Sequence, residues 1–300
     1  MTNIPLNTLV AAQPRKRRSK ERGSLPIVAG VLVLVFFIVM SFLAPILVGH
    51  GPNAVSGPPL DPPSPGHPFG TDVLGRDVFA RTFVAVHVDY LVAVLGALIS
   101  LAIGTILGTL AGTAKRTQWG TVLMRVTDAL IAVPFPLLIL MILLTVGNQV
   151  SVLGTAPGVF QILVGVVTVG WSIYARLARA ESSGLRSREY VIAAELMGYG
   201  KYRITFRHIM PAVIAVTGTY AVADAVMIVG FVASLPFLGA GVPPPTPEWG
   251  SMMYEGRASI VSAWWQVIFP ALALTVSAVA ASIIADGLLD RTSKKLRKHE

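Results

Sequence analysis

The sequence predicts an all-α membrane protein with six transmembrane helices, and three observations support this fold class. Of the 300 residues, 54% are hydrophobic and 13% are charged, and the mean hydropathy is +0.69, a balance outside that of soluble domains. Six apolar segments each reach the roughly 20 residues that a helix needs to cross a bilayer. Most of the basic residues lie between or beyond these segments. The predicted spans are residues 27–48, 86–113, 121–146, 158–179, 212–235 and 264–288.

The positions of the basic residues predict the orientation, because Lys and Arg accumulate in cytoplasmic segments. Of the 24 Lys and Arg residues, 21 lie ahead of the first span, around the second connection, in and after the end of the fourth span, or in the C-terminal tail. The other three are Arg76, Arg81 and Arg257. Both termini and the segment before the fifth span are therefore predicted to be cytoplasmic.

The two ends of the chain are predicted to be basic cytoplasmic tails, residues 1–24 and 291–300, on either side of a membrane domain at 25–290. The first tail is attracted at most to anionic lipid headgroups. The apolar stretch at 25–48 is longer than the core of a secretory signal, so we expect it to be retained as the first span. The net charge of +9 fits this topology, and because aromatic residues are not interleaved with the basic ones, no nucleic-acid partner is expected.

The first connection and the second span have distinctive compositions. Residues 49–72 are rich in Pro and Gly, which predicts an extended external loop. In the second span Gly104, Gly108 and Gly112 repeat at every fourth position, a spacing that allows another helix backbone to approach closely. We interpret this stripe as ordinary helix packing.

Prolines and one acidic residue mark the later spans. Pro134 and Pro136 are expected to kink the third span and Pro270 the sixth, because each removes a backbone donor within a helix. Asp224 lies midway along the fifth span, where a charge is costly and so indicates a function. It either lines a pathway or holds a hydrogen-bond network between helices, and the sequence leaves both readings open.

Catalytic and metal-binding motifs are absent from the sequence. It has no cysteine, and its five histidines show no HExxH spacing. Neither a GxSxG nucleophile elbow nor a GxxxxGK[ST] phosphate loop occurs. We therefore expect a non-catalytic chain without a metal or cofactor of its own, and any ATP-driven step requires a separate ATPase chain.

The polar and basic segment at 189–211, EYVIAAELMGYGKYRITFRHIMP, lies between the fourth and fifth spans. A helix beginning at Glu189 places four residues on one narrow face beside Gly198, which can also end the helix in a left-handed cap. These four are Tyr190, Ala193, Ala194 and Met197. The residues alone leave two readings, a helix that docks on a cytoplasmic partner and an ordinary connecting helix.

This segment resembles the EAA loop of ABC-importer permease subunits, whose pattern is EAA, three residues, Gly, nine residues and then I-x-L-P. The pattern falls on Ile192, Ala193, Ala194, Gly198, His208, Met210 and Pro211. Two positions depart from it, Ile192 and His208, and the form YVxAAxxxG followed by RHxxP resembles the peptide and nickel branch with its DppC- and OppC-like members. The signatures HPFGTDVLGRDVFAR at 67–81 and FLGAGVPPPTPEWGSMMYEGR at 237–257 resemble the same branch.

The resemblance implies a type I ABC-importer permease fold in a bacterial cytoplasmic membrane, with a cytoplasmic coupling helix. It also implies three kinds of partner: a second, DppB/OppB-like permease chain, two ATPase domains that bind ATP and Mg, and an external binding protein. Pro211 would fix a sharp exit into the fifth span. The implied coupling residues are Tyr190, Ala193, Ala194, Glu195, Met197, Gly198, Arg207, His208 and Pro211. The candidate docking residues for a binding protein are Pro243, Pro244, Pro245 and Trp249.

The function implied by the resemblance is that of a permease subunit in an ATP-driven importer of dipeptides or oligopeptides. Nickel, glutathione and haem importers of the same branch are alternatives. A further alternative is an ion-coupled carrier in which Asp224 is the ion site.

Overall fold

The structure is a computed structural model that describes residues 24–114, 118–146, 151 and 154–297. The predicted tail at 1–24 lies almost entirely outside the described residues, as does the end of the tail at 291–300. Within the described part, the regular elements are helical apart from two isolated backbone bridges in the first connection. The helices are α1 (Ser24–Val48), α2 (Val78–Val84), α3 (Val86–Thr113), α4 (Gln118–Ala132), α5 (Phe135–Val146), α6 (Val159–Leu185), α7 (Glu189–Leu196), α8 (Lys201–Ile204), α9 (Met210–Ser234), α10 (Trp249–Gly256) and α11 (Trp265–Arg297).

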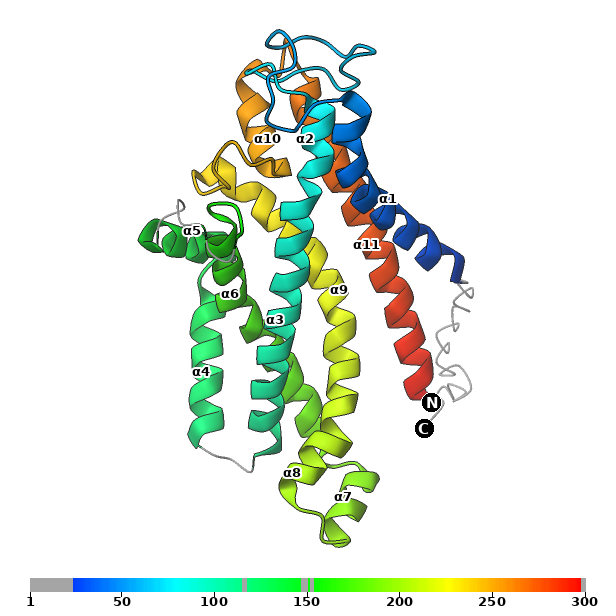
Figure 1. The fold of residues 1–300 in the computed structure, drawn as a ribbon. Coiled ribbons are helices and arrows are strands. Elements are labelled where there is room, and N and C mark those ends of the chain that lie inside the picture. The colour runs from blue at the N-terminus through cyan, green and yellow to red at the C-terminus, as the bar shows by residue number, and fades with distance from the viewer. Residues whose placement is uncertain (1–23, 115–117, 147–150, 152–153, 298–300) are drawn as a thin grey trace, which may run out of the picture.

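Long helices run side by side between two ends of the molecule (Figure 1). At one end lie α10, α2 and the first connection, and at the other lie α7 and α8. We call these the α10 end and the α7 end. Five of the helical segments are long and apolar enough to cross a membrane, and they correspond to the first, second, fourth, fifth and sixth predicted spans. The sixth continues through Pro270 as one helix.

The third predicted span, at 121–146, is broken into α4 and α5. The two helices bend by 92° at the break that contains Pro134, so α5 lies across the bundle while α4 runs along it (Figure 1). The kink predicted at this position is therefore confirmed, but it is much sharper than a kink within one crossing. Six spans result only if α4 and α5 together count as one.

The glycine stripe of α3 lies directly against α6. A methyl group on Gly108 would overlap the carbonyl oxygen of Ala175, and one on Gly112 would overlap the hydroxyl of Ser182. The same holds at Gly104. The interpretation of this stripe as helix packing is confirmed, and only glycine fits at these backbone contacts.

Replacing Gly108 by valine is expected to lower the thermal unfolding temperature markedly, because the new side chain meets backbone that cannot rotate away. Overpacking of this kind costs about 1–3 kcal/mol or more. Gly230→Val in α9 is the control, since nothing lies within 4 Å of a methyl group at that position. Equal unfolding temperatures for the two variants in the same detergent would contradict this account.

Candidate functional site

The helix α7 stands out from the α7 end of the bundle and ends in a tight glycine cap (Figure 1). Gly198 has φ +79°, and its N–H donates to the carbonyl of Glu195 while the N–H of Tyr199 donates to that of Ala194. This pair of bonds satisfies the last carbonyls of the helix through a left-handed residue. The prediction that Gly198 ends the helix is confirmed.

The inner side of α7 packs on the chain itself. Val191 and Ala194 are buried in a small hydrophobic cluster with Ala178 of α6 and with Ile204 and Val213. Ala194 therefore does not lie on the exposed face where helical spacing placed it. A short helix cannot hold its position without burying some apolar side chains, and Val191 and Ala194 serve this purpose.

The outer side of α7 and the helix that follows expose large apolar side chains. Leu196 is 83% exposed, Met197 64% and Tyr202 81%. Large apolar side chains exposed in such number along one short segment indicate an interaction surface. We call this surface the α7 patch, and it consists of Tyr190, Ile192, Leu196, Met197, Tyr202 and Phe206. Ala193, Glu195 and Gly198 are exposed between these residues.

Three polar or aromatic side chains brace the loop behind the patch. The guanidinium of Arg203 lies 4.2 Å from the ring centroid of Tyr199, and the ring of His208 stacks on the same tyrosine at 5.9 Å. A cation over an aromatic face and a stacked pair both restrict the ring between them. His208 thus acts from behind the patch, and Arg207 is exposed beside it.

The chain does not turn sharply at Pro211. Residues Lys201–Leu238 form one continuous helical segment, and Thr205–Ile209 is a π-helical turn within it. The N–H of Met210 donates to the carbonyl of Thr205, five residues earlier. Pro211 follows in the first turn of α9, and the wider turn before it accommodates a residue that has no N–H and whose ring crowds the preceding turn. The predicted sharp exit is therefore wrong.

Asp224 takes part in a hydrogen-bond network between α6 and α9. Its carboxylate accepts a 2.8 Å hydrogen bond from the hydroxyl of Tyr174, a fully buried residue. The ring of Tyr220 meets that of Tyr174 edge-on at 5.4 Å. Asp224 itself is half-buried, so this chain does not enclose it completely.

At the α10 end, the predicted docking residues have different roles. Trp249 is fully buried, and its ring N–H donates to the carbonyl of Thr82 at 2.8 Å. It therefore anchors α10 to α2. Because the first turn of α10 is enclosed by the bundle, Trp249 does not face a partner, and its predicted role in docking is wrong. Pro244 and Pro245 are exposed and Pro243 is half-buried, so a surface remains there.

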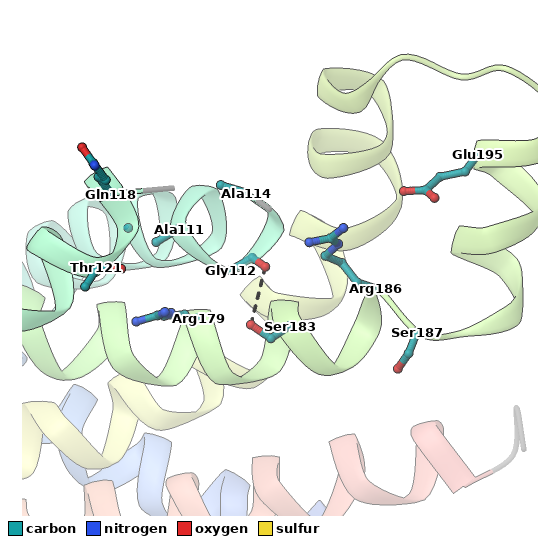
Figure 2. A pocket seen from close by; sticks show the side chains of 11 residues that line it. Ala111, Gly112, Ala114, Gln118, Thr121, Arg179, Ser183, Arg186, Ser187 and Glu195 are labelled. Atoms are coloured by element: carbon teal, nitrogen blue, oxygen red, sulfur yellow. Dashed lines mark hydrogen bonds between the residues drawn. The ribbon is translucent and has the colours of Figure 1, made fainter. Parts of the chain in front are cut away.

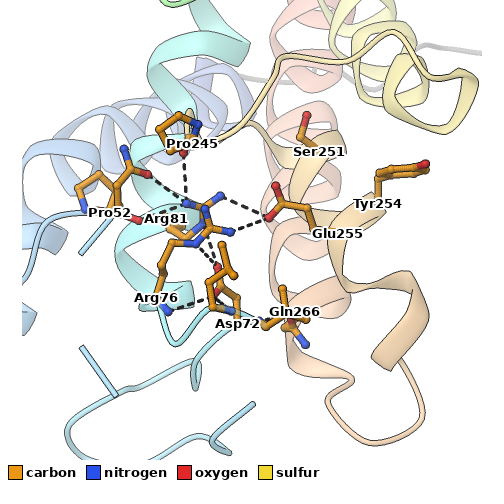
Figure 3. Close-up of polar contacts among 12 residues, drawn as sticks. Pro52, Asp72, Arg76, Arg81, Pro245, Ser251, Tyr254, Glu255 and Gln266 are labelled. Carbon is orange, nitrogen blue, oxygen red and sulfur yellow. Dashed lines mark hydrogen bonds and ion pairs between the residues drawn. The ribbon is translucent and has the colours of Figure 1, made fainter. Parts of the chain in front are cut away.

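Two arginines and two carboxylates lock the first connection onto α10 (Figure 3). Arg76 bonds Asp72 at 2.6 Å and Glu255 at 2.8 Å, and Arg81 lies 3.6 Å from each of the same two carboxylates. Arg81 also donates to the carbonyl of Pro245. In the sequence, Arg76 and Arg81 indicate only the orientation of the chain in the membrane. No local pattern links them to Glu255, so their ion pairs could not be predicted.

Asp89 of α3 and Glu248, the N-cap of α10, form a second buried contact. Glu248 accepts from the N–H groups of Gly250 and Ser251, both at 2.7 Å, and Asp89 accepts from the N–H of Trp249. The two carboxyl groups also meet each other, and burial raises the pKa of Glu248 above its ordinary value of 4.5. We expect these two buried carboxyl groups to share a proton, because two charges so close together and so far from water repel each other.

The stability of this contact is expected to depend on pH. Because the pKa of Glu248 is higher in the folded chain, that chain keeps a proton which the unfolded chain releases above pH 4.5. The free energy of unfolding should therefore fall as the pH rises from 4.5 through the raised pKa. Asp89→Asn replaces one carboxyl group by a neutral amide and should therefore flatten this pH dependence. The measurement is thermal unfolding between mildly acidic and mildly alkaline pH, and Asp61→Asn is the control that should keep the wild-type dependence. A wild-type slope in the Asp89 variant would refute the shared proton.

Among the described residues, no group of three or more His, Cys, Asp or Glu side chains has a metal-binding arrangement. The ring Nδ1–H of His67, within the first connection, donates a 2.7 Å hydrogen bond to the carboxylate of Asp77, the N-cap of α2. This pair fixes the start of α2, so His67 has a structural partner.

Comparison with known proteins places the chain in a family. Residues 104–298 match the family of binding-protein-dependent transport system inner membrane components. The chain is 36% identical over 293 residues to a putative peptide transport system permease protein of Brucella suis, covering 94% of this chain and 91% of that protein. It is also 33% identical to the oligopeptide transport system permease protein OppC of Bacillus subtilis over 273 residues, 90% of this chain and 85% of OppC. Identity to the dipeptide transport system permease protein DppC of the same organism is 33% over 275 residues, 90% of this chain and 82% of DppC. The chain has helices long and apolar enough to span a membrane, and these relatives match it along nearly all of its length. It therefore belongs to the family of inner membrane components of binding-protein-dependent transport systems.

Proposed function

We propose that this chain forms half of the translocation pathway of an ATP-driven peptide importer and couples to an ATPase through the α7 patch. The patch is the observation that carries the proposal, because Leu196, Met197 and Tyr202 expose large apolar surface on a helix fixed to the bundle. Such a surface suits a partner with an apolar groove. The relatives named as peptide permeases favour peptides as the substrate.

The proposed coupling residues divide by position. Tyr190, Ala193, Glu195, Met197 and Gly198 are exposed with the patch, and Arg207 lies exposed nearby. Ala194, His208 and Pro211 act on the position of the loop and not by direct contact. Closure of the ATPase domains would then push on α7, and the rigid α6 and α9 on either side would transmit the movement.

The half-buried Asp224 supports a position for the pathway. A carboxylate in the middle of a span is costly against lipid, so its open side requires water or another protein chain. We place the second, homologous permease chain opposite this face of α6 and α9. Both termini and the α7 end lie in the cytoplasm in this arrangement, and an external binding protein docks at the α10 end near Pro244 and Pro245.

The test is uptake into proteoliposomes that contain this chain, the second permease chain and the ATPase subunits, with the binding protein outside. Labelled dipeptide or oligopeptide should enter only with ATP and Mg inside. Uptake of nickel, glutathione or haem in place of peptide would change the substrate and keep the transporter class. Uptake by this chain alone, driven by an ion gradient and abolished by Asp224→Asn, would favour an ion-coupled carrier and refute the proposal.

A further inference from the structure

Among the described residues, a cleft of about 730 Å³ lies at the α7 end of the bundle. It lies between the end of α3, the beginning of α4, the end of α6 and α7 (Figure 2). Its volume is in the range of sites that bind small molecules, about 300–1,000 Å³. No element of the coupling surface described above fills it.

Two arginines line this cleft, Arg179 of α6 and Arg186 directly after the end of this helix. Arg179, Ser183 and Arg186 are four and three residues apart, which places them on one face of the helix, below the end of α3 (Figure 2). Both arginines are half-buried, and neither guanidinium makes an ion pair or a side-chain hydrogen bond within the part of the chain that the structure describes. By contrast, Arg176, one turn before Arg179 on the same side of α6, is paired with Asp128 at 3.7 Å.

The charge of the cleft is positive. Among the described residues that line it, Arg179 and Arg186 are opposed by one carboxylate, that of Glu195 on α7. A guanidinium that has lost part of its water and has no protein partner gains most from an anion that accepts two parallel hydrogen bonds. Phosphate oxygens have this geometry.

The surroundings of the cleft favour a lipid as the source of the phosphate. On α4 beside it, Trp119, Val122 and Val126 are exposed and form an apolar strip that leads away from the cleft along the helix. An exposed tryptophan at the end of a membrane helix is typical of the headgroup level, and basic pockets between such helices bind anionic headgroups. An acyl chain along α4 would bring its headgroup to Arg179 and Arg186.

We propose that the cleft between α3, α4 and α6 binds the phosphate of an anionic phospholipid headgroup through Arg179 and Arg186. The bound lipid would fix the end of α6 next to α7. The site is independent of what the transporter carries, because it rests on charge, cavity and membrane position alone.

The proposal is tested on the purified transporter complex, stripped of lipid and supplied with phosphatidylglycerol or phosphatidylcholine. Native mass spectrometry should show phosphatidylglycerol retained at least about tenfold more tightly by the wild type than by Arg179→Gln/Arg186→Gln, since the variant loses its charge-assisted hydrogen bonds to the phosphate. Phosphatidylcholine, whose choline cation offsets the charge of its phosphate, should be retained less tightly than phosphatidylglycerol by the wild type. Arg125→Gln/Arg257→Gln also removes two positive charges, here from exposed residues outside the cleft, and it should retain phosphatidylglycerol as the wild type does.

Several results would overturn the proposal. One is equal retention of phosphatidylglycerol by the cleft variant and the wild type, and another is an equal loss in the control variant, which would indicate unspecific attraction. A third concerns inorganic phosphate. If it raised the unfolding temperature of the wild type but not of the cleft variant, and phosphatidylglycerol gave no further rise, the ligand would be a soluble anion. If the cleft variant loses only its ATPase partner, the cleft is a protein contact. The single variants Arg179→Gln and Arg186→Gln provide the same comparison if the double variant does not fold.

Discussion

Arg81→Ala is expected to destabilise the α10 end by about 3–5 kcal/mol, the usual cost of breaking a buried ion network by removing one partner. Arg81 is 1% exposed, and its guanidinium lies between Asp72 and Glu255 while it also donates to the side chain of Asn53. Without it, two carboxylates remain near a single arginine, Arg76, in a place with little water. The first connection should then detach from α10.

The measurement is thermal unfolding in detergent together with limited proteolysis of the first connection at residues 49–77. Arg257→Ala is the matched control, because Arg257 is also an arginine at the α10 end but is exposed. It lies 3.5 Å from the ring centroid of Tyr254 and donates a hydrogen bond to the carbonyl of the same residue. Its loss should cost no more than about 1 kcal/mol. Similar unfolding temperatures and cleavage rates for the two variants would refute a locking role for the network.

The spans could be predicted from the sequence because the bilayer imposes their length and composition. The second span was predicted at 86–113 and α3 is Val86–Thr113. The third span shows where this reasoning ends, because prolines indicate that a helix breaks but not by what angle. The 92° bend depends on α5 packing against α6, where Ile139 meets Gly165, and these residues are far apart in the sequence.

In the segment around α7, too, features that depend on neighbouring residues could be predicted, and features that depend on distant residues could not. The cap at Gly198 follows from local chemistry and could be predicted. The direction in which α7 faces could not, because apolar residues lie on several sides of an eight-residue helix and the choice depends on Ile204 and Val213 beneath it. Leu196, the most exposed residue of the patch, was missed for this reason, although a leucine in a polar segment was a usable signal. The pairing of Arg76 and Arg81 with Glu255 likewise joins distant parts of the chain.

Leu196→Asp/Met197→Asp is expected to abolish ATP-driven uptake while the chain stays folded. Both side chains are mainly exposed in this chain, at 83% and 64%, so the charges cost little stability here. Buried in an apolar groove of an ATPase, each would leave an unpaired carboxylate. Residues at the centre of an interface contribute about 2 kcal/mol or more each, which corresponds to a loss of affinity of roughly 30-fold for a single one.

Co-purification of the ATPase subunits separates this loss from other causes of failed transport. The double variant should lose them and keep the wild-type unfolding temperature. Val261→Asp, at the α10 end and 96% exposed, should keep both, because it adds the same charge to an exposed apolar position far from α7. Ala194→Asp should instead lower the unfolding temperature, since Ala194 is buried on the inner side of α7. If the double variant retained the ATPase subunits and their coupled uptake, the α7 patch would not be the coupling surface, and the apolar exposure of Leu196 would need another partner.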